Sequence, residues 1–266
     1  MGSVMKKLLL TSVALTVLAI RPGMAADMSV PVYRGPVAVY SWTGCYVGGN
    51  IGGGSAKQNA NEATLLSATV FTAPANVTYT TSGLIGGAHA GCNVEGTYGV
   101  ARGWVFGIEG DWTATKLSST QIAPNLFPNG TPIGFGSVTF TENTKWLASI
   151  RGRAGVAVVP NLLVYATAGV VWNLTDYTGL HTYAPCPTCS ASAFDSRNFG
   201  WVAGGGLEWA IGNSNWIARV EGLYYKVSGA SPYGTEAAIA QTTTTWYWND
   251  LGIVEGRVGL SYKFGY

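Results

Sequence analysis

A two-residue periodicity, with charge confined to one parity, is the feature of this sequence that most constrains its fold. Between Trp104 and Trp112 every second residue is apolar or glycine, whereas the other parity carries Glu109 and Asp111. The same alternation recurs after Trp146, after Trp216 and over residues 254–266. A helix would scatter these charges around its circumference, but a strand places them all on one face. The pattern therefore predicts β-strands with one apolar and one polar face.

The segments between the alternating stretches differ regularly in length. We place strands at 42–53, 82–95, 103–116, 144–157, 162–173, 199–211, 216–226 and 252–266. Long segments rich in Thr, Ser, Asn and Pro separate them at 54–81, 117–143, 174–198 and 227–251, and short turns at 96–102, 158–161 and 212–215. Outer-membrane barrels have long loops on the outside and short turns at the periplasm. We therefore expect an all-β fold, an eight-stranded antiparallel up-and-down transmembrane β-barrel with four long extracellular loops.

The composition agrees with a chain that faces lipid through strands. Only 11% of the residues are charged, against about 25% in an ordinary soluble domain, yet the mean hydropathy is +0.21. No apolar run reaches the roughly 20 residues that a membrane helix needs. The sequence holds no block of like charge, so we expect no nucleic-acid partner.

Aromatic residues of the apolar parity recur eight residues apart, as in the pair Trp104 and Trp112 and the pair Trp201 and Trp209. Eight tilted strand residues climb roughly 20 Å, close to the height of the apolar band between the two aromatic girdles of a barrel. One girdle is expected to hold Trp104, Trp209, Trp216, Tyr262 and Phe264, and the other Trp112, Trp146, Trp172, Trp201 and Tyr224. The alternative is that these side chains fill the core of a soluble β-sandwich.

The charged parity must then face the barrel interior. The expected interior ion-pair network consists of Glu109, Asp111, Arg151, Arg153, Glu208, Arg219, Glu221, Glu255 and Arg257. An eight-stranded barrel is just wide enough inside for side chains to fill it. Isolated charges there would each cost several kcal/mol, so we expect them to pair as a structural network. The alternative is that some of these charges line a narrow polar path. His89, on the same parity, is expected to be a packed interior residue.

The N-terminus has the pattern of a secretory signal peptide. Lys6 and Lys7 precede a 13-residue apolar run, and small residues lead up to a cleavage site after Ala25. We expect a signal peptide at 1–25, a periplasmic lead-in at 26–41 and the barrel at 42–266. Removing 1–25 takes away three basic residues and no acid, so 12 basic and 13 acidic residues remain.

The four cysteines are compatible with disulfides, because export leads to an oxidising compartment. Cys186 and Cys189 form a CxxC in a predicted loop, and without a surrounding βαβ pattern a local disulfide is preferred to a redox pair or a metal site. Cys45 and Cys92 lie toward the same end of the first two strands, where a cross-strand disulfide is possible.

Several motifs together resemble those of the alphaproteobacterial immunogenic outer membrane proteins, the small porin-family barrels. They are Trp42-Thr43-Gly44-Cys45-Tyr46-Val47-Gly48-Gly49, Gly107-Ile108-Glu109-Gly110-Asp111, Arg151-Gly152-Arg153-Ala154-Gly155 and the closing Arg257-Val258-Gly259-Leu260-Ser261-Tyr262-Lys263-Phe264. The resemblance covers essentially the whole mature chain. It implies an eight-stranded, surface-exposed and antigenic barrel associated with envelope integrity. It also implies recognition by the barrel-assembly machinery through the C-terminal strand. Cys45 and Cys92 stand where the family usually carries aromatic residues.

These observations favour a structural outer-membrane barrel that is not an enzyme, has no cofactor or metal, and has outer-membrane lipid and lipopolysaccharide as partners. The alternative is a narrow channel, or a loop-based receptor for a small hydrophobic or haem-like ligand. A lipid-active enzyme ranks last, because the sequence offers no Ser-His-Asp or paired-carboxylate arrangement. The glycine-rich runs lack the Lys-Ser/Thr of a phosphate-binding loop.

Overall fold

The computed structural model describes residues 40–66, 69–71, 77–98, 102–126, 132–183, 186–212, 214–229, 233–235 and 242–264. The predicted signal peptide and most of the predicted lead-in lie outside these residues. The strands are β1 (Gly44–Leu66), β2 (Thr69–Phe71), β3 (Val77–Glu95), β4 (Trp104–Leu126), β5 (Pro132–Val159), β6 (Leu162–Tyr183), β7 (Cys186–Ala210), β8 (Trp216–Val227), β9 (Tyr233–Thr235), β10 (Thr242–Trp248) and β11 (Leu251–Phe264).

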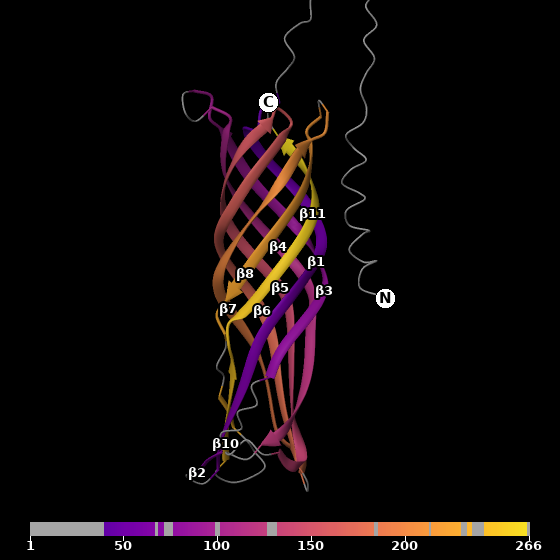
Figure 1. Cartoon of the computed structure of the whole chain (residues 1–266), viewed down its shortest axis with the longest axis vertical. Coiled ribbons are helices and arrows are strands. Elements are labelled where there is room, and N and C mark those ends of the chain that lie inside the picture. Colours follow the sequence, from indigo (N-terminus) through magenta and orange to yellow (C-terminus); the bar gives the residue numbers. More distant parts are fainter. Residues whose placement is uncertain are drawn as a thin grey trace, which may run out of the picture. The chain divides into compact units, whose positions relative to one another are not determined.

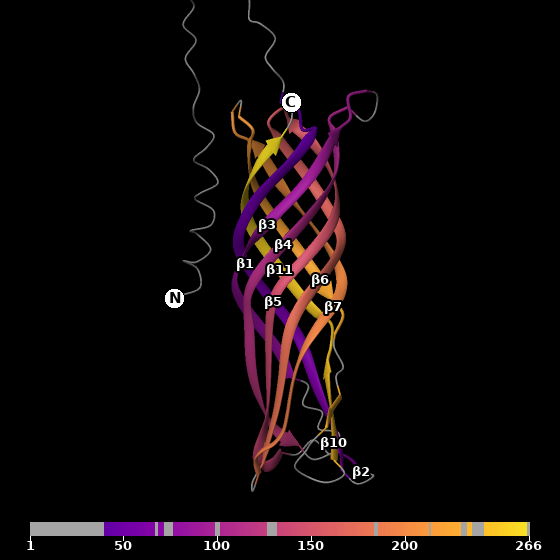
Figure 2. The same cartoon turned by 180° about the vertical axis from the view of Figure 1, so that it is seen from behind.

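Eight of these strands form a closed antiparallel barrel. Neighbours in sequence pair from β3 through β8, β11 follows β8, and β1 closes the ring by pairing with both β3 and β11. Figure 1 shows β11 beside β1 at this closure, and Figure 2 shows β3 to β7 following one another around the wall. The predicted eight-stranded up-and-down barrel is confirmed. The described residues contain no helix that is long and apolar enough to cross a membrane.

The barrel has two unlike ends, which we name by their connections. At the short-turn end, brief connections join β3 to β4, β5 to β6, and β7 to β8. At the hairpin end, β1 and β3 to β7 continue beyond the bounds that the sequence predicts, whereas β8 and β11 keep to theirs within one residue. Pairing between β4 and β5 runs to Leu126 opposite Pro132, and pairing between β6 and β7 runs to Tyr183 opposite Cys186.

The predicted long loops at 54–81, 117–143 and 174–198 are therefore wrong as irregular segments, because much of each is strand. In 227–251 the strands are the shorter β9 and β10, and β10 pairs with β1. The physical reason lies in threonine, which is common in loops although its branched Cβ favours strands. Alternation also continues there, since Leu117 and Ser119 are buried while Ser118 and Thr120 are exposed.

Inside and outside alternate along each wall strand, as in β8, where odd and even positions have opposite exposure. Between the two girdles the outward parity is mainly apolar, and large side chains such as Ile51, Val258 and Leu260 remain about half exposed. The inward parity contains the buried charges. Because side chains alternate along a strand except at bulges such as that between Thr144 and Trp146, the register fixes the contents of the lumen.

A disulfide joins the first two barrel strands at the short-turn end. Cys45 lies directly opposite Cys92 in the β1–β3 ladder, and their sulfur atoms are bonded. Both residues belong to the outward parity. The side chains of Cys186 and Cys189 lie outside the described part of the structure, so their predicted disulfide stays a prediction.

Replacing both cysteines, Cys45→Ala with Cys92→Ala, should lower the urea midpoint of the folded barrel. The bond closes a loop with a sequence separation of 47 residues, for which the chain-entropy model gives at most about 4 kcal/mol. Heat-modifiable gel migration in a urea series measures the midpoint. A reductant should shift the original protein to the midpoint of the double variant and leave that variant unchanged. An unshifted original protein would contradict a stabilising role.

Candidate functional site

The barrel lumen gathers most of the charged residues that the sequence places on the inward parity. We define the ion-pair layer as the eight residues Glu109, Asp111, Arg151, Arg153, Glu208, Arg219, Glu221 and Arg257, which come from β4, β5, β7, β8 and β11 and are all buried. Four are acidic and four are basic, so the layer is neutral in total when all eight are ionised.

Arg151 lies at the centre of this layer and is fully buried. Its Nη2 is 2.5 Å from Glu109 Oε1 and 3.1 Å from Asp111 Oδ2, while its Nη1 is 3.0 Å from Glu221 Oε1. One guanidinium therefore joins carboxylates from two strands of the wall. Charge-assisted hydrogen bonds of this kind are roughly twice as strong as those between neutral groups.

Arg219 and Arg153 connect the same layer to β7. Arg219 Nη2 is 2.6 Å from both Glu109 Oε2 and Glu208 Oε1. Arg153 Nη2 is 2.7 Å from Glu208 Oε2, and its Nη1 is 3.3 Å from Glu109 Oε2. Two acids and two bases thus share partners, so removing any one of them leaves more than one group unsatisfied.

Arg257 extends the layer to the closing strand β11. Its Nη2 is 2.6 Å from Glu221 Oε2, and its Nη1 is 3.2 Å from Asp111 Oδ1. Glu255, the ninth predicted network residue, is also buried. Its hydrogen-bond partner is neutral, since the Tyr225 hydroxyl donates to its Oε2 at 3.1 Å.

Two tyrosines that the sequence pattern did not single out, Tyr46 and Tyr165, complete the layer. The Tyr46 hydroxyl donates to Glu109 Oε2 at 2.6 Å and accepts from Arg153 Nη1 at 2.6 Å. The Tyr165 hydroxyl donates to Glu221 Oε1 at 2.9 Å, and its ring lies 4.0 Å from the Arg153 guanidinium carbon. Their position on the inward parity was the available signal.

His89 is buried in the lumen, close to Ser261 and Asn50. Its Nε2 lies 2.7 Å from Ser261 Oγ, and its Nδ1 lies 3.3 Å from Asn50 Nδ2. His89 and Ser261 are 2% and 1% exposed, which leaves no access for a substrate.

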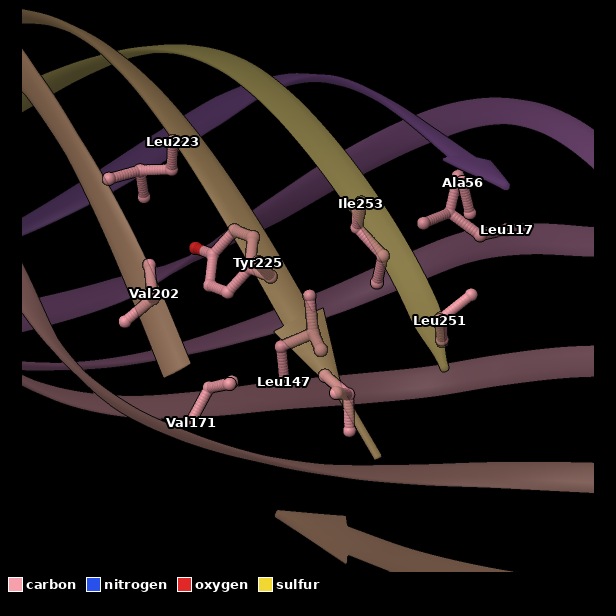
Figure 3. Close-up of a cluster of buried hydrophobic side chains, with 10 residues drawn as sticks. Ala56, Leu117, Leu147, Val171, Val202, Leu223, Tyr225, Leu251 and Ile253 are labelled. Carbon is pink, nitrogen blue, oxygen red and sulfur yellow. The ribbon is translucent and has the colours of Figure 1, made fainter. Parts of the chain in front are cut away.

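Beyond the ion-pair layer, toward the hairpin end, most of the buried side chains are apolar, with Glu255 at the level of Leu223. We define the apolar layer as the buried cluster Ala56, Leu117, Leu147, Val171, Val202, Leu223, Tyr225, Val227, Leu251 and Ile253. Figure 3 shows these side chains pointing into the barrel from strands around the wall. The layer follows the ion pairs directly, because Leu223 is the next inward residue after Glu221 on β8.

The short-turn end is filled by residues that precede β1. Trp42 is 1% exposed, and its indole Nε1 donates to the Pro160 carbonyl at 3.2 Å. It packs in a second apolar cluster with Val105, Leu163, Tyr165, Ala210 and Ile217, which we name the end plug. Lys263 lies over the Tyr40 ring at 4.4 Å and donates to the Ser41 carbonyl, tying the lead-in to the last strand.

At the hairpin end, buried polar and aromatic residues fill the barrel past the apolar layer. Glu142 is 3% exposed and lies four residues beyond Trp146 toward that end, outside the zone between the aromatic belts. The Thr144 hydroxyl donates to its Oε1 at 3.4 Å. Burial raises the pKa of the Glu142 carboxyl to about 7, against the lowering effect of the Thr144 hydrogen bond.

The ten predicted girdle residues all lie on the outward parity. Nine have large exposed surfaces, and Trp146 is half-buried. Several pack as neighbours, with ring centroids 5.5 Å apart for Trp201 and Tyr224 and 5.2 Å apart for Trp216 and Tyr262. The structure thus brings together side chains that the sequence assigned to the same girdle from different strands.

Among the described residues, no group of three or more His, Cys, Asp or Glu is arranged to hold a metal ion. The acids of the ion-pair layer instead face guanidinium groups at distances of 2.5 to 3.3 Å. The geometry therefore gives these carboxylates fixed protein partners.

The sequence matches a known family over nearly its whole length. The family model described as "Outer membrane protein beta-barrel domain" matches residues 14–264. The 31 kDa outer-membrane immunogenic proteins of Brucella melitensis and Brucella suis are each 26% identical over 274 residues, which cover 98% of this chain and 100% of theirs.

Solved structures with a similar course of the chain are more distant. The outer membrane protease OmpT from Escherichia coli has a TM-score of 0.45 at 10% identity, covering 86% of this chain and 99% of that one. The outer membrane protein OprG from Pseudomonas aeruginosa has a TM-score of 0.40 at 12% identity, covering 84% and 97%. At these TM-scores the likenesses carry no information about function.

The change Arg151→Ala should destabilise the barrel strongly, because it leaves three buried carboxylates short of a partner. Breaking a buried ion pair by removing one member costs roughly 3–5 kcal/mol. Urea unfolding in detergent, followed by tryptophan fluorescence, measures the loss. The control is Lys145→Ala, which removes a partly exposed ion pair with Asp176 and should cost about 1 kcal/mol or less. Unchanged stability with altered conductance in Arg151→Ala would instead indicate a polar path.

The change Glu142→Gln should stabilise the barrel in a pH-dependent way. The carboxyl has a pKa of about 7 when folded and 4.5 as the ordinary value, so ionisation penalises the folded state. The penalty is absent below about pH 4.5, grows up to pH 7 and is constant above it. We expect a gain on the order of 2–3 kcal/mol at pH 8 and none at pH 4. Urea midpoints at both pH values test this, with the exposed Asp250→Asn as control. A gain that is equal at both pH values would contradict the assignment.

Proposed function

The chain belongs to the outer-membrane β-barrel family, and from this premise we propose that it is a structural barrel that supports envelope integrity and conducts no solute. In this proposal the hairpin end faces the medium and presents its strands as a polar surface. Residues 1–25 direct export and are removed. The two aromatic girdles lie at the two interfaces of the outer membrane, where such rings are favoured.

The observation that carries the proposal is the filling of the lumen. The end plug, the ion-pair layer and the apolar layer succeed one another along the barrel axis. Each is made of buried side chains, and Trp42 and Trp248, both nearly inaccessible, lie toward opposite ends. The interior of an eight-stranded barrel is narrow enough for side chains to close it.

An ion moving through this lumen would meet two unfavourable regions. In the apolar layer it would lose most of its hydration against aliphatic side chains, and the Glu255 carboxyl at that level already accepts from the Tyr225 hydroxyl. Such a loss of hydration costs several kcal/mol or more. In the ion-pair layer it would have to displace guanidinium–carboxylate contacts of about 2.6 Å, such as Arg219 with Glu208. A balanced, mutually paired set of charges has no surplus of one sign to attract permeant ions. These features favour the structural role over the alternative of a narrow channel.

Within the part of the chain that the structure describes, the candidate for a catalytic role is the contact between His89 and Ser261. A Ser–His pair can activate a nucleophile only where a substrate carbonyl can approach the hydroxyl. Both side chains are buried within the barrel, so we propose that they form a packing and hydrogen-bonding contact and that the protein is not an enzyme.

The purified protein in a planar lipid bilayer should show no discrete conductance steps at neutral pH. The reason is the closed lumen described above, and heat-modifiable migration of the same sample verifies that the barrel is folded. A known porin added to the same bilayer serves as the positive control. Reproducible single-channel steps from the pure protein would overturn the structural proposal and favour the channel.

A further inference from the structure

The cations outside the lumen are distributed unevenly over the barrel wall. Five of them lie on the outward parity toward the hairpin end and are exposed, namely Lys57, Lys116, Lys145, Arg197 and Lys226. We name them the cation belt. At the short-turn end, the exposed cation of the described residues is Arg102. None of these side chains has a part in the filled lumen.

The cation belt lies just past the girdle of Trp112, Trp146, Trp172, Trp201 and Tyr224, toward the hairpin end. Lys116 follows Trp112 by four residues on β4, and Lys226 follows Tyr224 by two on β8. On β5 and β7, which run in the opposite direction, Lys145 and Arg197 precede their girdle tryptophans. On every one of these strands the cation is therefore at the level where lipid headgroups begin.

Two of the five cations flank a hollow at the barrel closure. Lys226 pairs with Gly252 across β8 and β11, and Gly252 pairs with Lys57 across β11 and β1. Thr80 follows Lys57 in the same row. Because Gly252 has no side chain, the two ammonium groups border an outward-facing gap between them.

The hollow has a volume of about 450 Å³ and contains donors suited to an anion. Its lining includes Lys57, Lys226, Ser55, Asn59 and Thr80. Asp250 also lines it and forms an exposed ion pair with Lys226 at 3.3 Å, a contact that an incoming phosphate would compete with. Lysine ammonium groups are effective phosphate partners as compact point charges.

The opposite side of the hollow is mainly apolar, with one hydroxyl group. Tyr224 and Val254 line it, and a Cβ placed on Gly252 would come within 3.3 Å of the Tyr224 hydroxyl oxygen. Val254 is 57% exposed on the lipid-facing parity. Phosphate-binding groups on one side and a lipid-facing wall on the other match a ligand that has a charged head and acyl chains.

We propose that the hollow between Lys57 and Lys226 binds a phosphate on the sugar headgroup of an outer-leaflet glycolipid. The rest of the cation belt holds further headgroups around the barrel. The inference rests on the proposed function, in which the hairpin end lies at the outer leaflet. It adds a specific lipid site to a barrel that would otherwise meet lipid only through its apolar wall.

The test is binding of bisphosphorylated lipid A, in mixed micelles, to the purified full-length barrel, with Kd from a titration at low salt. The double variant Lys57→Gln with Lys226→Gln should bind about 25-fold more weakly, since each lysine contributes about fivefold near an anionic headgroup. The matched control is Arg102→Gln, which removes an exposed cation at the other end and should leave Kd within twofold.

A second pair of variants tests the hollow without changing charge. Gly252→Val fills the gap between the lysines and should weaken binding, whereas Gly256→Val, on the same strand where a Cβ meets nothing within 4 Å, should not. Dephosphorylated lipid A should bind the original protein as weakly as bisphosphorylated lipid A binds the double-lysine variant. Inorganic phosphate, the free source of the same chemistry, should compete only at far higher concentration.

Equal binding of phosphorylated and dephosphorylated lipid A would overturn the proposal, as would an effect of Arg102→Gln equal to that of the lysine pair. Tight binding of inorganic phosphate would show an anion site rather than a lipid site. These failures differ from failure of the proposed function, because heat-modifiable migration and bilayer silence do not depend on Lys57 or Lys226.

Discussion

Charged groups inside an eight-stranded barrel cannot reach bulk water, and the rest of the structure depends on neutralising them where they stand. Each would cost several kcal/mol if left alone in that environment. Arg151 contacts three carboxylates, and Arg153, Arg219 and Arg257 pair with one or two of the same acids, Arg153 and Arg219 also with Glu208. A slip of one residue between two strands would move a whole set of these charges to the lipid face. The pairing requirement therefore fixes the register of the wall.

The layers on either side of the charges exclude water from the ion pairs. The apolar layer and the end plug keep water away, which strengthens every ion pair between them. In the proposed function, the same closure that protects the charges keeps solutes from crossing the barrel. In the proposed placement, the apolar parity meets lipid, and the cation belt marks the level at which headgroups replace acyl chains. Interior and exterior thus follow from one alternation of side chains read on two faces.

The parity of the sequence predicted the barrel and the inward residues because a two-residue period is a local property. The parity could not predict the length of the hairpins, because threonine is common in loops and in strands. Thr120 and Thr178 lie in strands within segments predicted as loops. Tyr46 was missed because a tyrosine on one strand does not reveal a carboxylate on another. Trp42 and Trp248 look like girdle residues by type, yet both are buried. The Lys57–Gly252–Lys226 row joins residues almost 200 positions apart, so it becomes visible only with the register.

A double-mutant cycle on Arg257 and Glu221 tests the central claim most directly. Their closest contact is 2.6 Å and both side chains are buried. The original protein and the variants Arg257→Met and Glu221→Gln, singly and together, are unfolded in urea, and their free energies of unfolding are compared. If paired charge holds the lumen together, the coupling energy should be about 2 kcal/mol or more, because buried partners in one network couple strongly. Coupling below about 0.5 kcal/mol, the size expected for independent sites, would contradict the account.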